Sequence, residues 1–366
     1  MLGLFLLLPV LSIYASQMPG ATPTLIGLAM GAYGLTQALL QMPFGRWSDR
    51  YGRRPIIIFG LILFLLGSIV GALAESLWMI IFARCLQGAG AISAAVTALL
   101  ADFTREAVRT RAMAFIGMSI GASFVVSLIA APLLEAAIGV SGIFWVMAGL
   151  ALLGILLLKV AVPVEGGQMS DPSATRIPTL RVAALPALRS YFVGVFALHF
   201  ILTATFLSVP LVLLHSLGIT EAAHWKVYLG VFLMSFLGTV PLILAAERAR
   251  RPHWIVALAV AASALAQAVL AISYAEQWPV FIAFTLFFAA FNFLEARLPA
   301  GLSKAAPVTD RGAAMGVFAT CQFLGAACGG MLGGQLLKFF GLGGVFWGSA
   351  LVALAWAGVV MVGEAE

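Results

Sequence analysis

The stretch from Gly45 to Pro55, GRWSDRYGRRP, places a carboxylate among arginines between two long apolar runs. Only 9% of the residues in the chain are charged, so this density of charge is exceptional. Four charged residues, Asp49, Arg50, Arg53 and Arg54, lie within six positions here. Gly45 and Gly52 can form turns. Such a segment is typical of a junction between two membrane helices at a water surface. Its simplest alternative is a basic loop with no mechanistic role.

Several ionisable side chains fall within apolar runs, where a charge in lipid is unfavourable, and three of them are candidates for function. Arg84 lies in ARCLQGAGA with Gln87, and a guanidinium at membrane depth costs roughly 2.5–3.5 kcal/mol unless it meets a cavity or partner. His199 lies in VFALHFILTATF, and imidazole suits proton transfer near neutral pH. Glu295 shares a helix face with Asn292 and could bind a proton or a cationic solute.

Each of these groups also has a structural interpretation. Arg84 could extend to the water surface, and His199 could be a hydrogen-bonded packing residue. Glu295 could form a peripheral ion pair with Arg297, two residues further on.

Polar and aromatic side chains in otherwise aliphatic runs are candidates for the wall of a solute cavity. Few of them are charged, so the cavity would suit a lipophilic or weakly polar solute better than a multiply charged metabolite. Aromatic residues in membrane spans are also common as lipid-facing packing. The candidates are Tyr14, Gln17, Tyr33, Gln37, Gln87, Thr203, Phe288, Phe291, Asn292 and Gln322.

The composition requires a lipid environment. Of 366 residues, 63% are hydrophobic, whereas soluble domains are nearer half. A net charge of +6 would suggest nucleic acid in a soluble protein, but here the distribution of charge along the chain matters more, and we expect no nucleic-acid partner. The scattered cysteines and histidines form no metal or disulfide pattern. With no nucleophile–base set or nucleotide loop visible, we expect neither an enzyme nor a metal site.

The apolar runs predict an all-α membrane protein with twelve spans in two six-helix halves. We expect an N-terminal bundle at 1–162, a polar cytoplasmic linker at 163–187 and a C-terminal bundle at 188–366. The first run begins at Met1 without a polar flank, so we expect its helix to be truncated. The spans are 1–17, 22–44, 55–74, 78–101, 111–137, 141–162, 188–216, 224–246, 254–273, 277–299, 311–338 and 341–362.

Basic residues set the expected orientation. Of the 20 Lys and Arg residues, 17 fall in loops on one side of this arrangement, which predicts that both termini are cytoplasmic. The halves also repeat at a fixed offset of 198 residues, which favours a carrier with its site between two duplicated halves. The positions in register are Pro43, Asp49, Arg50 and Arg53 with Pro241, Glu247, Arg248 and Arg251.

Two motifs carry a family resemblance. The pattern Gly-x3-Asp-x2-Gly-Arg-Arg from Gly45 resembles the loop signature of major facilitator superfamily transporters, and ARCLQGAGA resembles the fourth-helix pattern of that family. The resemblance spans Leu2 to about Val359. It is strongest to members that start earlier and carry a small soluble domain after the twelfth helix, so the chain should correspond to their membrane portion.

The resemblance implies roles for the charged residues. Asp49, Arg53 and Asp102 would form a charge relay, with Gly45 and Gly52 shaping its loop, and Arg84 would take part in proton coupling. Asp49 would also face the start of the eleventh helix. Static bracing of the loop is the alternative. The fifth span keeps Pro132 but lacks the glycines usual in drug–proton antiporters of the family, which argues against drug export specifically.

We therefore expect a monomeric secondary transporter in a bacterial inner membrane. It would export a small amphipathic solute by proton-coupled antiport, driven by the proton gradient and without a cofactor. The alternatives are a non-transporting membrane sensor or scaffold on the same fold, and an uncoupled facilitator or symporter.

Overall fold

The computed structural model describes residues 2–162, 179–249, 253–307 and 310–362. Across these ranges the chain is helical and holds no strand, which confirms the all-α prediction. The elements are α1 Leu2–Leu6, α2 Leu11–Gln17, α3 Pro23–Tyr51, α4 Arg53–Ala72, α5 Leu77–Ala89, α6 Ser93–Asp102, α7 Glu106–Ala161, α8 Thr179–Ala183, α9 Pro186–Leu211, η1 Val212–Ser216, η2 Glu221–Ala223, α10 His224–Arg248, α11 His253–Ser273, α12 Gln277–Ala305 and α13 Arg311–Val362.

Nine helices among the described residues are long and apolar enough to cross a membrane. Two of them, α7 and α13, each combine two arms that meet at a glycine. Gly139 has φ 68° and Gly341 has φ 66°, a left-handed conformation that side chains with a Cβ rarely adopt. The chain turns at these points, so each element supplies two spans in succession. The exact count of twelve stays a prediction.

Two predicted spans are interrupted. The run 1–17 forms α1 and α2 rather than one helix, because Pro9 lacks a backbone donor and the chain turns there. The run 78–101 breaks between α5 and α6 at Gly90, where an added Cβ would lie 2.3 Å from the carbonyl oxygen of Gly60. The break lets two helix backbones approach closely.

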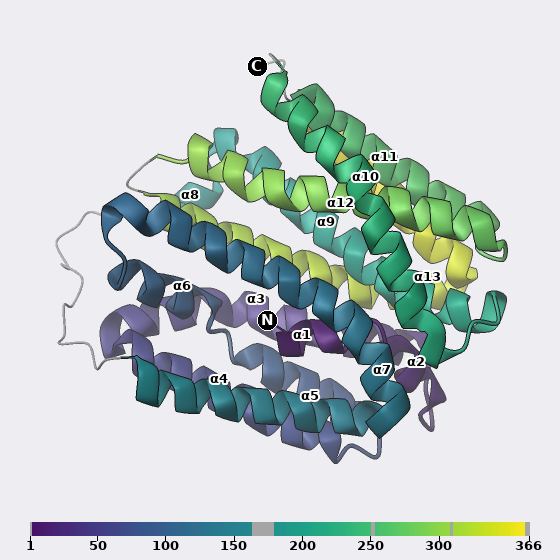
Figure 1. The fold of residues 1–366 in the computed structure, drawn as a ribbon, viewed down its shortest axis with the longest axis horizontal. Helices are drawn as coiled ribbons and strands as arrows, with labels where there is room; N and C mark the ends of the chain where they lie inside the picture. Colours follow the sequence, from purple (N-terminus) through teal and green to yellow (C-terminus); the bar gives the residue numbers. More distant parts are fainter. Residues whose placement is uncertain (1, 163–178, 250–252, 308–309, 363–366) are drawn as a thin grey trace.

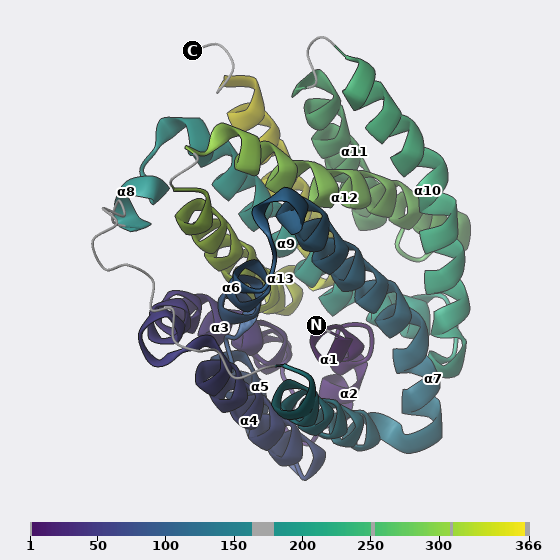
Figure 2. The same cartoon turned by 60° about the vertical axis from the view of Figure 1, so that its left-hand side comes forward.

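The chain forms an N-terminal half from α1 to α7 and a C-terminal half from α8 to α13, seen below and above in Figures 1 and 2. The most apolar 18-residue stretch of the span that contains α9 is 94% buried. This helix packs against α2, α12 and α13. The first arm of α7 runs along α10 of the other half. Most of the predicted linker, 163–178, lies outside the described residues, and its later part contains α8. The predicted domain limits stay predictions.

Candidate functional site

Arg53 gathers the predicted charge relay at the first residue of α4. Its side chain is buried, its Nε donates to Asp102 Oδ2 at 3.1 Å, and its Nη1 donates to Ser48 Oγ at 3.0 Å and to Asp49. Both carboxylates are partly exposed, at 34% and 49% of their side-chain surface. One guanidinium therefore joins α3, α4 and α6 at a water-accessible surface. We call the end of the molecule that carries these residues the basic end.

The local sequence explains how three helix ends meet there. Gly52 ends α3 with φ 92°, so the chain turns sharply and α4 begins at the next residue. Gly45 faces Ala94 of α6, whose Cβ would be 3.7 Å from a Cβ added to the glycine. Small residues thus let α6 approach α3 and bring Asp102 within reach of Arg53.

Arg84 lies in a second polar group inside the N-terminal half. It is only 4% exposed, which contradicts the alternative that it extends to the surface. Its Nη1 donates to Gln87 Oε1 at 3.0 Å, and Gln87 Nε2 donates to Ser68 Oγ at 2.9 Å. The guanidinium also lies 4.8 Å from the ring centre of Tyr33. The face of the Tyr33 ring and the side-chain amide of Gln87 therefore stabilise the positive charge of Arg84.

His199 is the centre of a polar group in the C-terminal half. Its Nδ1 lies 3.1 Å from the carbonyl oxygen of Val195, so it must donate there, and its Nε2 then accepts from Gln322 Nε2 at 2.8 Å. The carboxylate of Glu295 lies 3.7 Å from the same Nε2. A proton added to His199 would therefore meet a carboxylate. The alternative interpretation of Glu295 paired it with Arg297. Asn292 instead donates to Ser235 Oγ at 3.1 Å.

A cluster of phenylalanines joins the two halves beside His199. Phe124 of α7 has its ring centre 6.1 Å from Phe288 and 6.2 Å from Phe291, both on α12. Phe291 in turn lies 6.1 Å from the His199 ring. Phe288 and Phe291 are 1% and 5% exposed, so the cluster closes this region in the present conformation.

The other cavity candidates lie in different places. Gln37 is buried and donates to both Gln41 and Ser93, each at 3.1 Å. Thr203 is buried within α9, and Tyr14 is half-buried against the core. Gln17 is exposed at the end of α2, and its Nε2 donates to Glu221 Oε1 at 3.2 Å. Its place in a cavity wall stays a prediction.

At the end opposite the relay, the two halves pack tightly through α3 and α13. An added Cβ on Gly27 would lie 2.5 Å from the Gly330 carbonyl oxygen and 2.6 Å from the Gly334 Cα. Thr24 Oγ1 donates to Gln335 Oε1 at 3.4 Å across the same contact. We call this the closed end, because backbone touches backbone there.

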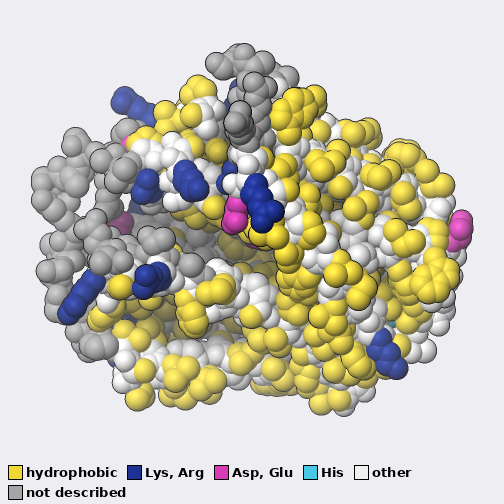
Figure 3. Space-filling model, turned by 45° about the horizontal axis from the view of Figure 1, so that its top comes forward, with side chains coloured by type: hydrophobic (Ala, Val, Ile, Leu, Met, Phe, Trp, Pro, Cys, Tyr) yellow, Lys and Arg dark blue, Asp and Glu magenta, His cyan; other side chains and the backbone are white. Residues whose placement is uncertain are grey.

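The basic end has the opposite character. In Figure 3 most of the visible Lys and Arg side chains lie over the left and centre of the view, and the surface beside them is hollowed. Gly312, in the first turn of α13, has no atom within 4 Å of a Cβ built upon it. The close α3–α13 contacts thus involve the far ends of these helices rather than the region of Asp49 and Arg311.

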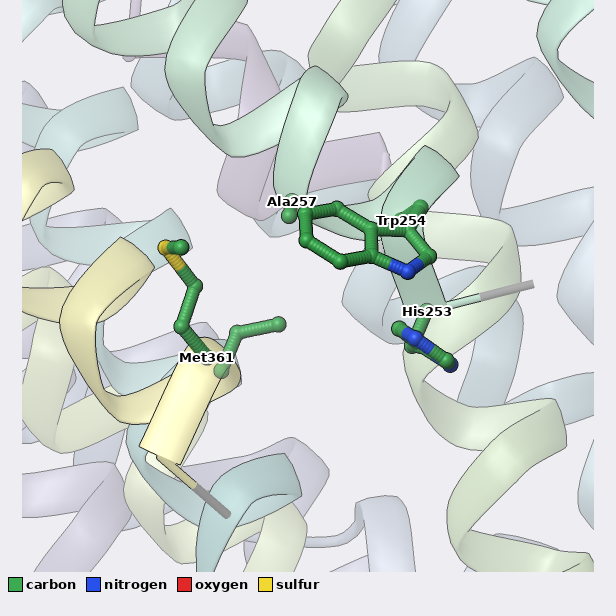
Figure 4. Close-up of a pocket in the computed structure, with 5 residues that line it drawn as sticks. His253, Trp254, Ala257 and Met361 are labelled. Atoms are coloured by element: carbon green, nitrogen blue, oxygen red, sulfur yellow. The ribbon is translucent and has the colours of Figure 1, made fainter. Parts of the chain in front are cut away.

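A small pocket lies away from these groups. It measures about 60 Å³ and is lined by His253, Trp254, Ala257, Val360 and Met361, from the start of α11 and the end of α13 (Figure 4). Typical ligand sites are about 300–1,000 Å³, so this pocket is too small for a solute. We assign it no role in transport.

Sequence reasoning missed the hydroxyl groups that connect these networks. Three of them, Ser48, Ser68 and Ser235, each accept from one side chain of the predicted set and donate to a backbone carbonyl oxygen. Ser93 accepts from Gln37 and donates to Gln41. Serine is common in membrane helices, so only its partners mark it. No group of three or more metal-binding side chains occurs among the residues that the structure describes.

The sequence model of the Major Facilitator Superfamily matches residues 1–251 and 191–364. The chain belongs to the major facilitator superfamily. Inner membrane transport protein YajR of Escherichia coli (strain K12) is 43% identical over 97% of this chain and 79% of its own length. The match confirms the predicted family, whose members are transporters and not enzymes.

Two further likenesses are to a multidrug resistance protein and to a solved transporter structure. Multidrug resistance protein 2 of Bacillus subtilis (strain 168) is 35% identical over 34% of this chain and 32% of its own length. The crystal structure of a bacterial homologue of the human lysosomal transporter Spinster, inward-facing and occupied, superposes with a TM-score of 0.77 at 13% identity, covering 99% of this chain and 93% of that one. This second likeness establishes the shared fold alone.

Proposed function

We propose that this superfamily member is a monomeric secondary transporter of a bacterial inner membrane that works by alternating access. The observation that carries the proposal is the asymmetry between its two ends. The halves meet backbone to backbone at the closed end, and the surface is hollowed beside the basic residues of the other end. Alternating access requires such a state, together with a second state in which the other end opens. The basic residues favour a cytoplasmic location for the basic end and for both termini.

Proton coupling is supported by the group around His199. Neutral His199 accepts from Gln322, and Glu295 lies 3.7 Å away, so one added proton would replace this bond by a pairing with the carboxylate. Glu295 is 40% exposed at its side chain and can exchange protons with water. The contacts of His199 would thus depend on protonation, beside a phenylalanine cluster that spans both halves.

A small amphipathic solute fits the character of this region. The region combines phenylalanine rings with a neutral amide, and few of the buried side chains that the structure describes are charged. Apolar walls with a few polar groups recognise lipophilic or weakly polar solutes. The partial likeness to a multidrug resistance protein supports export as the direction.

Proton movement in everted membrane vesicles tests the proposal. A pH-sensitive dye would report dissipation of a preformed proton gradient on addition of lipophilic cations, neutral amphiphiles or amino-acid-like solutes. We expect at least one class to dissipate the gradient, and Asp49→Ala to reduce that rate about tenfold or more, because Arg53 loses a charge-assisted hydrogen bond. Glu75→Ala, at an exposed carboxylate of the closed end, is the matched control and should keep the wild-type rate.

Other outcomes separate the alternatives. Solute uptake without proton movement would identify a facilitator. Solute binding without movement of either solute or protons across the membrane would identify a sensor or scaffold on this fold. Wild-type transport by Asp49→Ala would contradict the role of the relay.

A further inference from the structure

Arg84 is a buried cation whose partners are neutral. Only 4% of the residue is exposed, and its Nη1 donates to the side-chain oxygen of Gln87 at 3.0 Å. Its Nε is buried and bonds no acceptor within the described part of the chain, and the ion pairs found there do not include Arg84. A charge withdrawn from water is unfavourable unless an opposite charge and hydrogen bonds compensate it. The guanidinium can therefore bind a further acceptor, and a negatively charged one would be the most favourable.

The neutral partners of Arg84 fix its position without neutralising its charge. Gln87 Nε2 donates to Ser68 Oγ at 2.9 Å, and Ser68 Oγ donates to the carbonyl oxygen of Phe64 at 2.7 Å. This chain of hydrogen bonds ends on the backbone of α4 and brings in no negative group. It holds the guanidinium through Nη1 alone. The other edge, formed by Nε and Nη2, presents two parallel N–H groups that match the two oxygens of a carboxylate.

Aromatic rings connect this guanidinium to the other half of the molecule. The ring centre of Tyr33 lies 4.8 Å from Arg84 Cζ and 6.3 Å from the ring centre of Phe323 on α13. Phe64 of α4 packs against the same pair of rings. A cation beside apolar rings can bind a negative head group together with the apolar body attached to it.

The group lies where the close contact between the two halves ends. An added Cβ on Gly34 would lie 2.7 Å from the carbonyl oxygen of Phe323. Gly316, about two turns nearer the start of α13, has no atom within 4 Å of such a Cβ. Tyr33 directly precedes Gly34, so Arg84 and its rings lie at the inner limit of the closed end. A carrier that works by alternating access holds its solute at such a position between its halves.

We propose that Arg84 binds the carboxylate of the transported solute, an amphipathic monocarboxylate. The two carboxylate oxygens accept from Nε and Nη2, and the bond from Nη1 to Gln87 is kept. The apolar body of the solute enters between Tyr33 and Phe323, whose contact it replaces. The inference rests on the proposed function, because it narrows the amphipathic solute of that proposal to an anionic one. An arginine that only joined α4 and α5 would show no preference for the charge of a ligand.

Binding of three probes that share one apolar body tests the site without requiring transport. The probes are hexanoate, hexanamide and hexylammonium, titrated calorimetrically into the purified full chain in lipid nanodiscs at about pH 7, where the carboxyl group is ionised. Empty nanodiscs correct for partition of each probe into lipid. We expect hexanoate to bind about tenfold or more tightly than hexanamide, because hydrogen bonds between ionised groups are roughly twice as strong as neutral ones. Hexylammonium should bind more weakly than either.

Two substitutions at Arg84 separate its charge from its geometry. Arg84→Gln keeps a polar side chain without the charge, so its affinity for hexanoate should fall to that for hexanamide. Arg84→Lys keeps the charge but lacks the two parallel donors, so it should still prefer hexanoate but bind it several-fold more weakly than the wild type. Arg189→Gln, at an exposed arginine of α9, is the matched control and should keep all wild-type affinities. Each variant must elute as a single folded species, and Arg84→Lys decides if Arg84→Gln does not.

Three results would overturn this assignment. The first is a wild-type protein that binds no hexanoate at millimolar concentration, or binds hexanamide equally well. The second is a folded Arg84→Gln variant that keeps the preference for hexanoate. The third is an Arg84→Lys variant with the wild-type affinity for hexanoate. Carboxylate binding that depends on Arg84 without any flux in vesicles would contradict the proposed function and support the site. Flux of other solutes without a carboxylate preference would do the reverse.

Discussion

At the scale of single residues, the protein stabilises two buried arginines in different ways. Arg53 sits at a water surface and contacts two carboxylates, so its charge is neutralised by ion pairing. Arg84 lies inside the N-terminal half, where its described contacts are the Gln87 amide and the face of Tyr33. A guanidinium suits this site because it is planar, donates from fixed positions and stacks on an aromatic ring.

Replacing Arg84 by lysine should therefore destabilise the protein although it keeps the charge. An ammonium group cannot stack over Tyr33 and bond Gln87 with the same geometry, and we expect a loss of about 1–3 kcal/mol in the free energy of unfolding. Thermal melting in detergent measures the effect. Arg50→Lys, at an exposed arginine over the ring of Tyr51, is the control and should melt like the wild type. Equal melting temperatures for both variants would contradict a specific role for the Arg84 guanidinium.

At the scale of elements, close contact between α3 and α13 keeps one end of the molecule shut in this structure. Small residues allow helix backbones to touch in a membrane, where dispersion contacts replace the hydrophobic effect as the driving force. An added Cβ on Gly330 would lie 2.6 Å from the Gly31 nitrogen and 2.9 Å from the Gly27 carbonyl oxygen. Both neighbours are backbone atoms, which cannot move aside as a flexible side chain would.

A single methyl group at Gly330 should thus weaken the closed end. We expect Gly330→Ala to increase the reaction rate of a reporter, Thr24→Cys, with a membrane-impermeant maleimide several-fold, since about 1 kcal/mol of lost contact shifts a two-state equilibrium about fivefold. Gly316→Ala, on the same helix where a Cβ has open space, is the matched control. Unchanged reactivity in Gly330→Ala would mean that the α3–α13 contact does not limit access.

At the scale of the whole molecule, the two ends cannot be open together if the halves rock as rigid bodies. Residues far apart in sequence hold the closed end: Thr24 contacts Gln335, Gln17 contacts Glu221, and the Ser12 hydroxyl donates to the Phe206 carbonyl oxygen at 3.4 Å. In the proposed alternating-access cycle these contacts must break each time, so a covalent bond at this position should stop the cycle.

A disulfide between Thr24→Cys and Gln335→Cys tests this expectation. In a chain whose three native cysteines are replaced, oxidation should abolish solute flux, and reduction should restore it. Each single-cysteine variant under the same oxidant serves as control and should retain flux. Full transport by the cross-linked protein would exclude a rocking movement that opens the closed end.

The sequence by itself determined the helical membrane fold, the family and the groups that are local in the chain. Asp49 and Arg53 lie four residues apart on either side of the turn at Gly52, which brings them together. Arg84 and Gln87 are three residues apart in α5, so helix geometry places them side by side. The spacing of residues along a helix did not predict which partner each polar side chain binds. Asn292 and Glu295 share a face of α12, yet Asn292 bonds Ser235 and Glu295 approaches His199, because each side chain follows its nearest polar neighbour.

Only the tertiary structure decided which residues meet across the two halves. Phe124 with Phe291 and Tyr33 with Phe323 depend on how one half is tilted against the other. The same sequence must support a second tilt if it transports by alternating access, and these pairs would then separate. Apolar periodicity specifies that a helix has a buried face, whereas the partner of that face is set by the packing of the whole bundle.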